Sequence, residues 1–122
     1  MAEGFANCYG GDVLRAESRG LVPAPHVPRQ SILAMSEKNI DISKHVSRRY
    51  IPQDGATADI VVNMSDYPLP GIPPRHLIEW KIVDPYGQPI EAFRTTRDTL
   101  EQRVMSLILQ LRRTGPGRRR PA

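Results

Sequence analysis

The sequence predicts an α/β domain built around a parallel sheet. Two apolar stretches, "ADIVVNM" at 58–64 and "LIEWKIV" at 77–83, are predicted strands, and a long amphipathic helix is predicted at 90–113. The run at 58–64 is continuous rather than alternating, which is typical of a parallel strand buried on both faces. Strands that alternate with helices favour the α/β class with right-handed crossovers.

The first element is a predicted helix. Its apolar side chains recur at i, i+4, i+7 and i+8, namely Met1, Phe5, Cys8 and Tyr9, and a Gly-Gly pair at 10–11 ends it. The next stretch, "DVLRAESRG" at 12–20, is a predicted short strand that ends in a turn at Gly20.

Proline-rich loops separate the central elements. "LVPAPHVPRQ" at 21–30 and "YPLPGIPPRH" at 67–76 are predicted loops. The stretch at 31–39 is a predicted short helix with Ser31 as its N-cap and an apolar side of Ile32, Leu33 and Met35. Residues 40–51 mix extended and helical signals without clear boundaries, and the dipeptide at 54–55 signals a turn.

The last helix has the clearest pattern. It follows a turn, "DPYGQP" at 84–89, and an apolar stripe runs along it. The stripe consists of Phe93, Leu100, Val104, Leu107, Ile108 and Leu111.

Length and charge suit one domain at 1–113 followed by a basic tail at 114–122, which we expect to be disordered. Seventeen basic and thirteen acidic residues give a net charge of +4, and five arginines lie in the final "RRTGPGRRRPA". No basic-then-apolar leader is visible, a single cysteine cannot form an internal disulfide, and "VMSLILQL" is too short to span a bilayer. We therefore expect a soluble cytoplasmic protein without a membrane partner.

The spacing of the three histidines and the single cysteine does not match a metal-binding motif. His26, His45 and His76 are widely separated in the sequence, and one cysteine adds little. We expect neither a metal nor another cofactor.

Four stretches, in order, closely resemble the low-molecular-weight protein tyrosine phosphatases and the related thioredoxin-coupled arsenate reductases. They are "MAEGFAN", "AMSEKNIDISKHVSR", "ADIVVNM" and "WKIVDPYGQP…FRTTRDTLEQRV", and they extend to about residue 113. The resemblance implies a three-layer domain with helices on both faces of a four-stranded parallel sheet in the order 2-1-3-4.

In that family, a central strand and a phosphate loop of the pattern C-x-x-x-x-x-R-S/T precede the opening helix. The 122-residue sequence begins after the corresponding point, so we expect strand 1 and the loop to be absent from it. A misassigned start, a truncated gene and a non-catalytic relative would each explain this, and we favour the first. The loop would supply the nucleophilic thiolate and the arginine that binds phosphate.

The resemblance assigns roles to two residues of the 84–89 turn. Asp84 would be the general acid that protonates the departing oxygen and then activates water. Pro85 favours an extended conformation at Asp84, which would hold the carboxylate on one side of the turn. Tyr86 would border the active-site mouth and stack on a phosphotyrosine ring. The alternatives are a turn aspartate without chemistry and an exposed tyrosine, whereas Trp80 is a predicted core residue.

Cys8 does not replace the family nucleophile. The residue that would complete C-x-x-x-x-x-R after Cys8 is Leu14, and Arg15 lies one position too far along. We expect Cys8 to be an inert, small buried hydrophobe on the apolar side of its helix. Arsenate reduction would require further cysteines, and a serine, Ser65, stands where one would be offered, so we expect that activity to be excluded.

Two functions remain open. The first is a phosphatase of this type, acting on a phosphotyrosine protein or a small aryl phosphate, and inactive in the 122-residue form because the loop is missing. The alternative is a non-catalytic binding protein whose arginine tail contacts acidic partners such as nucleic acid. Salt-dependent RNA or DNA binding that is lost on removal of residues 118–120 would favour the alternative.

Overall fold

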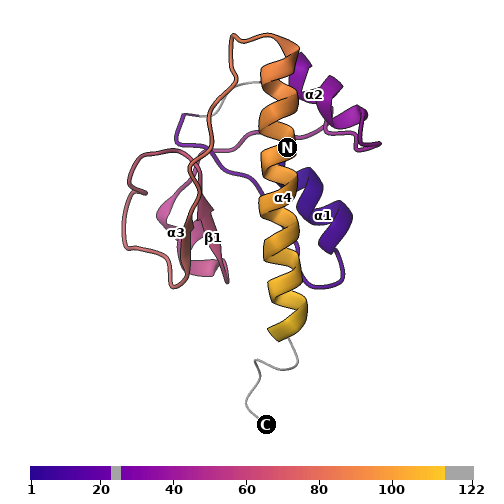
Figure 1. Cartoon of the computed structure of the whole chain (residues 1–122). Coiled ribbons are helices and arrows are strands. Elements are labelled where there is room, and N and C mark those ends of the chain that lie inside the picture. The colour runs from indigo at the N-terminus through magenta and orange to yellow at the C-terminus, as the bar shows by residue number, and fades with distance from the viewer. Residues whose placement is uncertain (23–25, 115–122) are drawn as a thin grey trace.

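The computed structural model describes residues 1–22 and 26–114, and these form four helices and two strands (Figure 1). The helices are α1 (Ala2–Gly10), α2 (Arg29–Ser36), α3 (Pro52–Thr57) and α4 (Ile90–Thr114). The strands are β1 (Val61–Asn63) and β2 (Leu77–Glu79). In the view of Figure 1, α1 and α2 lie on one side of the long α4 and the strands lie on the other.

The two strands form a parallel pair, which confirms the α/β class. Val61, Val62 and Asn63 pair in register with residues 77, 78 and 79. The sheet formed by the described residues has only these two strands, so the edge of β1 that faces away from β2 is not paired within it. The predicted burial of β1 on both faces holds only in part, because Val61 and Val62 are half-buried and Asn63 is buried.

The predicted strand at 12–20 does not form. Only Gly20 makes a bridge, to Arg49 in parallel orientation. The side chain of Asn7 instead takes both backbone groups of Ala16, donating to its carbonyl at 3.0 Å and accepting from its N–H at 2.8 Å. The segment begins in a turn, in which the Val13 and Leu14 N–H groups donate to the Gly10 carbonyl, and continues without regular structure because a strand needs a neighbouring backbone and this one is held by a side chain.

The central helices differ from their predicted limits. The helix predicted at 31–39 is α2, which begins at Arg29 after Pro28, so Ser31 lies inside the helix and is buried instead of capping it. The apolar side also differs, since Leu33 is 47% exposed while Met35 is fully buried. The turn signal at 54–55 lies within the short helix α3, whose Asp54 carboxylate accepts the Ile51 N–H at 2.9 Å.

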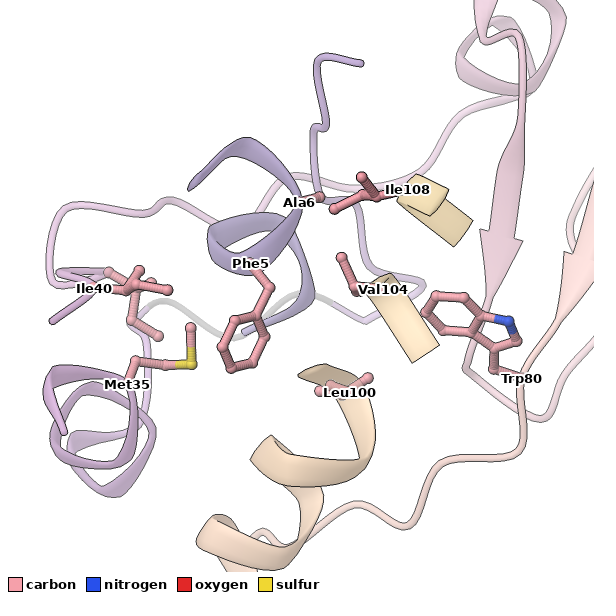
Figure 2. Packing of buried hydrophobic residues seen from close by; sticks show 9 residues of the cluster. Phe5, Ala6, Met35, Ile40, Trp80, Leu100, Val104 and Ile108 are labelled. Carbon is pink, nitrogen blue, oxygen red and sulfur yellow. The ribbon is translucent and has the colours of Figure 1, made fainter. Parts of the chain in front are cut away.

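The core lies where α1, α2 and α4 meet (Figure 2). Phe5 of α1 points between Met35 of α2 and Leu100 of α4, and Trp80 closes the far side of α4, as expected for a core residue. Cys8 is exposed, which corrects the prediction that it is a buried hydrophobe. The buried side of α1 is formed by Gly4, Phe5, Ala6 and Gly10, so Cys8 lies outside the buried face of this helix.

Helix α4 is confirmed nearly as predicted, from Ile90 to Thr114. A buried arginine links it to α2: the Arg97 guanidinium donates to the Ala34 carbonyl at 3.0 Å and pairs with the Glu37 carboxylate. Arg97 is 8% exposed, and its charge is matched by Glu37 and Asp98. Charge pairing and main-chain hydrogen bonding offset the cost of burying the guanidinium.

Candidate functional site

A cavity of about 430 Å³ opens beside the start of α1. Its wall is formed by the first residues of α1, the segment that enters α2, residues 82–86 and the first half of α4. We call it the α1 cavity. It contains both residues that the sequence singled out, Asp84 and Tyr86, which remain predicted site residues.

The N-terminus of α1 faces this cavity. Met1 and Ala2 are part of its lining, and no side chain caps the helix. The first main-chain hydrogen bond of α1 runs from the Phe5 N–H to the Met1 carbonyl at 3.1 Å, so the preceding N–H groups lack partners within the helix. Burial lowers the pKa of the Met1 α-amino group. The cavity therefore borders the positive end of a helix dipole, which favours an anion.

Asp84 begins a tight turn at the cavity wall. Its Oδ1 accepts the Tyr86 N–H at 3.0 Å, and the Gln88 N–H donates to the Pro85 carbonyl at 2.9 Å. Gly87 supplies the positive φ of 78° that the turn requires. The Asp84 and Tyr86 side chains are exposed, whereas Pro85 is buried. Asp84 and Tyr86 flank the buried Pro85, so the turn places a carboxylate and an aromatic ring at the cavity wall.

Polar residues without a predicted functional role also line the α1 cavity. They are Ser18, His26, Ser31, Ser47 and Thr96. Thr96 is buried, and its hydroxyl donates to the carbonyl of Val83 at 3.2 Å. The sequence spacing could have identified Thr96 as a buried residue, because it stands three residues after Phe93 and four before Leu100, on the apolar stripe of α4. A polar residue at a position of the apolar stripe indicates that its side chain hydrogen-bonds to a buried group.

Cys8 does not belong to this site. It is exposed on α1 and is not part of the lining of the α1 cavity. The 122-residue sequence contains no C-x-x-x-x-x-R motif, and the described residues do not place a thiol beside Asp84. The arginines at 118–120 lie outside the described residues, so the prediction of an acidic partner stays untested.

Within residues 1–22 and 26–114, no helix combines the length and the apolar character needed to cross a membrane. A cytoplasmic location stays a prediction.

Comparison with known proteins agrees with this architecture. Residues 1–116 match the family described as low molecular weight phosphotyrosine protein phosphatase. The chain is 32% identical over 116 residues to a glutaredoxin arsenate reductase of Synechocystis sp., a match that covers 91% of this chain and 87% of that protein.

Two solved structures extend the comparison. One is an arsenate reductase in the reduced state, with a TM-score of 0.80 and 32% identity over 90% of this chain and 86% of the other. The second is a low molecular weight protein tyrosine phosphatase from T. tengcongensis, with a TM-score of 0.76 and 25% identity over 91% and 89%. Because the family match spans nearly the whole sequence and the fold agrees with it, this chain belongs to the low molecular weight phosphotyrosine protein phosphatase family.

Proposed function

We propose that this domain serves the hydrolysis of phosphomonoesters, with Asp84 as general acid and Tyr86 at the mouth of the site. The observation that carries the proposal is that one cavity collects Asp84, Tyr86 and the uncapped N-terminus of α1. An anionic phosphoryl group would be stabilised by the helix end, while a carboxyl group nearby could protonate the departing oxygen. Tyr86 is 76% exposed, so its ring is free to contact an aryl group.

The chemistry requires a nucleophile that the 122-residue sequence does not contain. In the proposed reaction, a thiolate from a C-x-x-x-x-x-R loop attacks phosphorus, the P–O bond breaks, and Asp84 gives its proton to the leaving oxygen. Asp84 then removes a proton from water, which attacks the cysteinyl-phosphate and releases phosphate and the thiolate. The 122-residue chain by itself should therefore not turn over.

Several relatives are named arsenate reductases, and arsenate is a tetrahedral oxyanion like phosphate. Reduction of arsenate by a cysteine relay needs additional thiols to resolve the thiol adduct as a disulfide. The sequence has one cysteine, Cys8, and it is exposed on α1 away from the α1 cavity. Within the 122 residues, a serine, Ser65, stands where the family resemblance would offer such a resolving thiol, and this supports hydrolysis as the better proposal.

The test is to extend the protein by a β-strand and a C-x-x-x-x-x-R-S loop directly before Met1. A thiolate placed at the positive end of α1 has a lowered pKa and is a better nucleophile near neutral pH. The extended protein should hydrolyse phenyl phosphate and lose nearly all turnover when the added cysteine becomes serine. Asp84→Ala should lower its rate by about 10²–10⁴-fold, the usual scale for loss of a general acid.

Matched control variants distinguish the loss of the general acid from the loss of any exposed negative charge. Asp59→Ala removes another exposed aspartate, which is not part of the lining of the α1 cavity, and should leave the rate unchanged. Cys8→Ser should also have no effect. If the extended protein folds cooperatively yet stays inactive, or if Asp84→Ala does not slow it, the proposed role of Asp84 is wrong. Turnover by the 122-residue chain that depends on Asp84 would reveal a different nucleophile.

A further inference from the structure

Two consecutive threonines of α4 use their hydroxyl groups differently. Thr95 is exposed, and its hydroxyl donates to the Glu91 carbonyl one turn earlier at 3.1 Å. Thr96 is 8% exposed, and its hydroxyl leaves the helix to donate to the Val83 carbonyl at 3.2 Å. Bonding to the carbonyl four residues earlier is the usual local choice for a helical threonine, so the contact of Thr96 is a tertiary one.

The Thr96 contact acts on the peptide unit that leads into Asp84. The Val83 carbonyl and the Asp84 N–H belong to one planar unit, so fixing the carbonyl also fixes the direction in which the chain enters Asp84. Thr96 and Asp84 both line the α1 cavity, although only Asp84 is exposed. Loss of the hydroxyl would leave the Val83 carbonyl without its side-chain donor and allow the peptide unit to rotate.

The other side of Asp84 is held independently. Pro85 is buried, and its carbonyl accepts the Gln88 N–H at 2.9 Å. Asp84 thus lies between two anchors, one from α4 and one within the turn. The α4 anchor can be removed without altering a residue of the turn itself.

We propose that Thr96 is a positioning residue, whose hydroxyl holds the Val83–Asp84 peptide and thereby directs the Asp84 carboxylate into the α1 cavity. The proposal deepens the proposed function, since it rests on Asp84 as the general acid. Thr96 touches neither the leaving group nor phosphorus in this role, and acts only through the main chain.

The first test uses the 122-residue chain and needs no activity. The Tyr86 amide donates to Asp84 Oδ1, so its rate of hydrogen exchange with solvent reports whether this carboxylate stays in place. We call its protection from exchange the Tyr86 response. In Thr96→Val, which keeps the shape of the side chain and removes the donor, the Tyr86 response should be largely lost, so that the amide exchanges faster. Thr95→Val is the matched control and should keep it, and Thr96→Ser, which retains a hydroxyl, should restore it.

A Thr96→Val protein that is folded and shows the wild-type Tyr86 response would overturn the proposal. If Thr96→Val does not fold, Thr96→Ala and Thr96→Ser decide the question by the same measurement. Loss of the response in Thr96→Ser, or an unchanged response in Thr96→Ala, would also contradict the role of the hydroxyl.

The second test uses the extended, active protein and two leaving groups. A general acid matters more for phenyl phosphate than for p-nitrophenyl phosphate, because phenolate is the more basic leaving group. Thr96→Val should lower kcat/KM, which reports the steps up to departure of the leaving group, by roughly 10-fold or more with phenyl phosphate and by less than about 3-fold with p-nitrophenyl phosphate. An equal loss with both substrates would indicate a general structural defect and overturn the positioning role. An inactive extended protein would count against the proposed function, while the Tyr86 response would still test Thr96.

Discussion

Gly10 lets α1 pack tightly against Ile108 of α4. A Cβ atom at this position would lie 2.7 Å from Cγ1 and 2.8 Å from Cδ1 of Ile108. Carbon atoms in contact prefer about 3.5–4.0 Å, so each contact would be about 1 Å too short. Ile108 is fully buried in the core cluster and has little room to withdraw. Gly10→Ala therefore places a methyl group in space that is already occupied.

Two opposing effects set the size of the change. Alanine is favoured over glycine in a helix by up to about 1 kcal/mol, and by less at the last residue of a helix, where Gly10 lies. Overpacking of a filled core costs about 1–3 kcal/mol. We expect Gly10→Ala to lower the free energy of unfolding by about 1–2 kcal/mol, a sizeable part of the roughly 5–15 kcal/mol of a typical domain.

The assay is urea unfolding followed by the fluorescence of Trp80, the single tryptophan, which lies in the same cluster as Ile108. Ile108→Val serves as the second mutation of a double-mutant cycle. It should cost about 0.5–1.5 kcal/mol in the wild type, and clearly less beside Gly10→Ala because the valine lacks the Cδ1 atom that clashes. The reasoning is refuted if Gly10→Ala raises stability, or if Ile108→Val costs the same in both proteins.

Two further predictions concern pH. The hydrogen bond of the Tyr9 hydroxyl to Glu101, at 2.8 Å, together with burial raises the pKa of Tyr9 to about 12, so its contribution is complete below pH 10 and is lost as the pH rises through about 12. Tyr9→Phe should remove that alkaline loss in unfolding midpoints measured between these limits. Hydrogen bonds from Arg94 and then Arg97 lower the pKa of Glu37 to about 2 from 4.5. Stability contributed by Glu37 should therefore be present above pH 4.5 and lost as the pH falls toward 2, and acid titration of Glu37→Gln should show a shallower decline across that range.

The spacing of apolar residues and the positions of proline and glycine predicted the elements that depend on neighbouring residues. The stripe on residues 90–113 predicted α4, since a long helix is specified by apolar residues on one face. The apolar runs predicted both strands, although each is only three residues long in the structure. The turn at 84–89 was also predicted, because proline and glycine restrict or widen the allowed backbone angles locally.

Elements that depend on distant partners were predicted poorly. The strand expected at 12–20 fails because its backbone is held by the Asn7 side chain, a contact without a sequence pattern. Cys8 fits an apolar stripe by spacing, yet the buried side of α1 consists of Gly4, Phe5, Ala6 and Gly10. Gly4 lies against Met35 and residues 40 and 42, and Gly10 lies against Ile108 of α4. Helical spacing alone does not show which of two neighbouring faces meets its partner most closely.

The candidate site also has a part that the sequence predicted and a part that only the tertiary structure shows. The sequence by itself determined the α/β class, the long final helix and, through family resemblance, the choice of Asp84 and Tyr86. Only the tertiary structure brought these residues to the N-terminus of α1 and placed the Thr96 hydroxyl on the Val83 carbonyl. The physical reason is the sequence distance over which each interaction acts. Backbone angles and amphipathic faces are specified by residues that are near in the sequence. A cavity, and a hydroxyl contact between residues thirteen positions apart, exist only once the helices have packed.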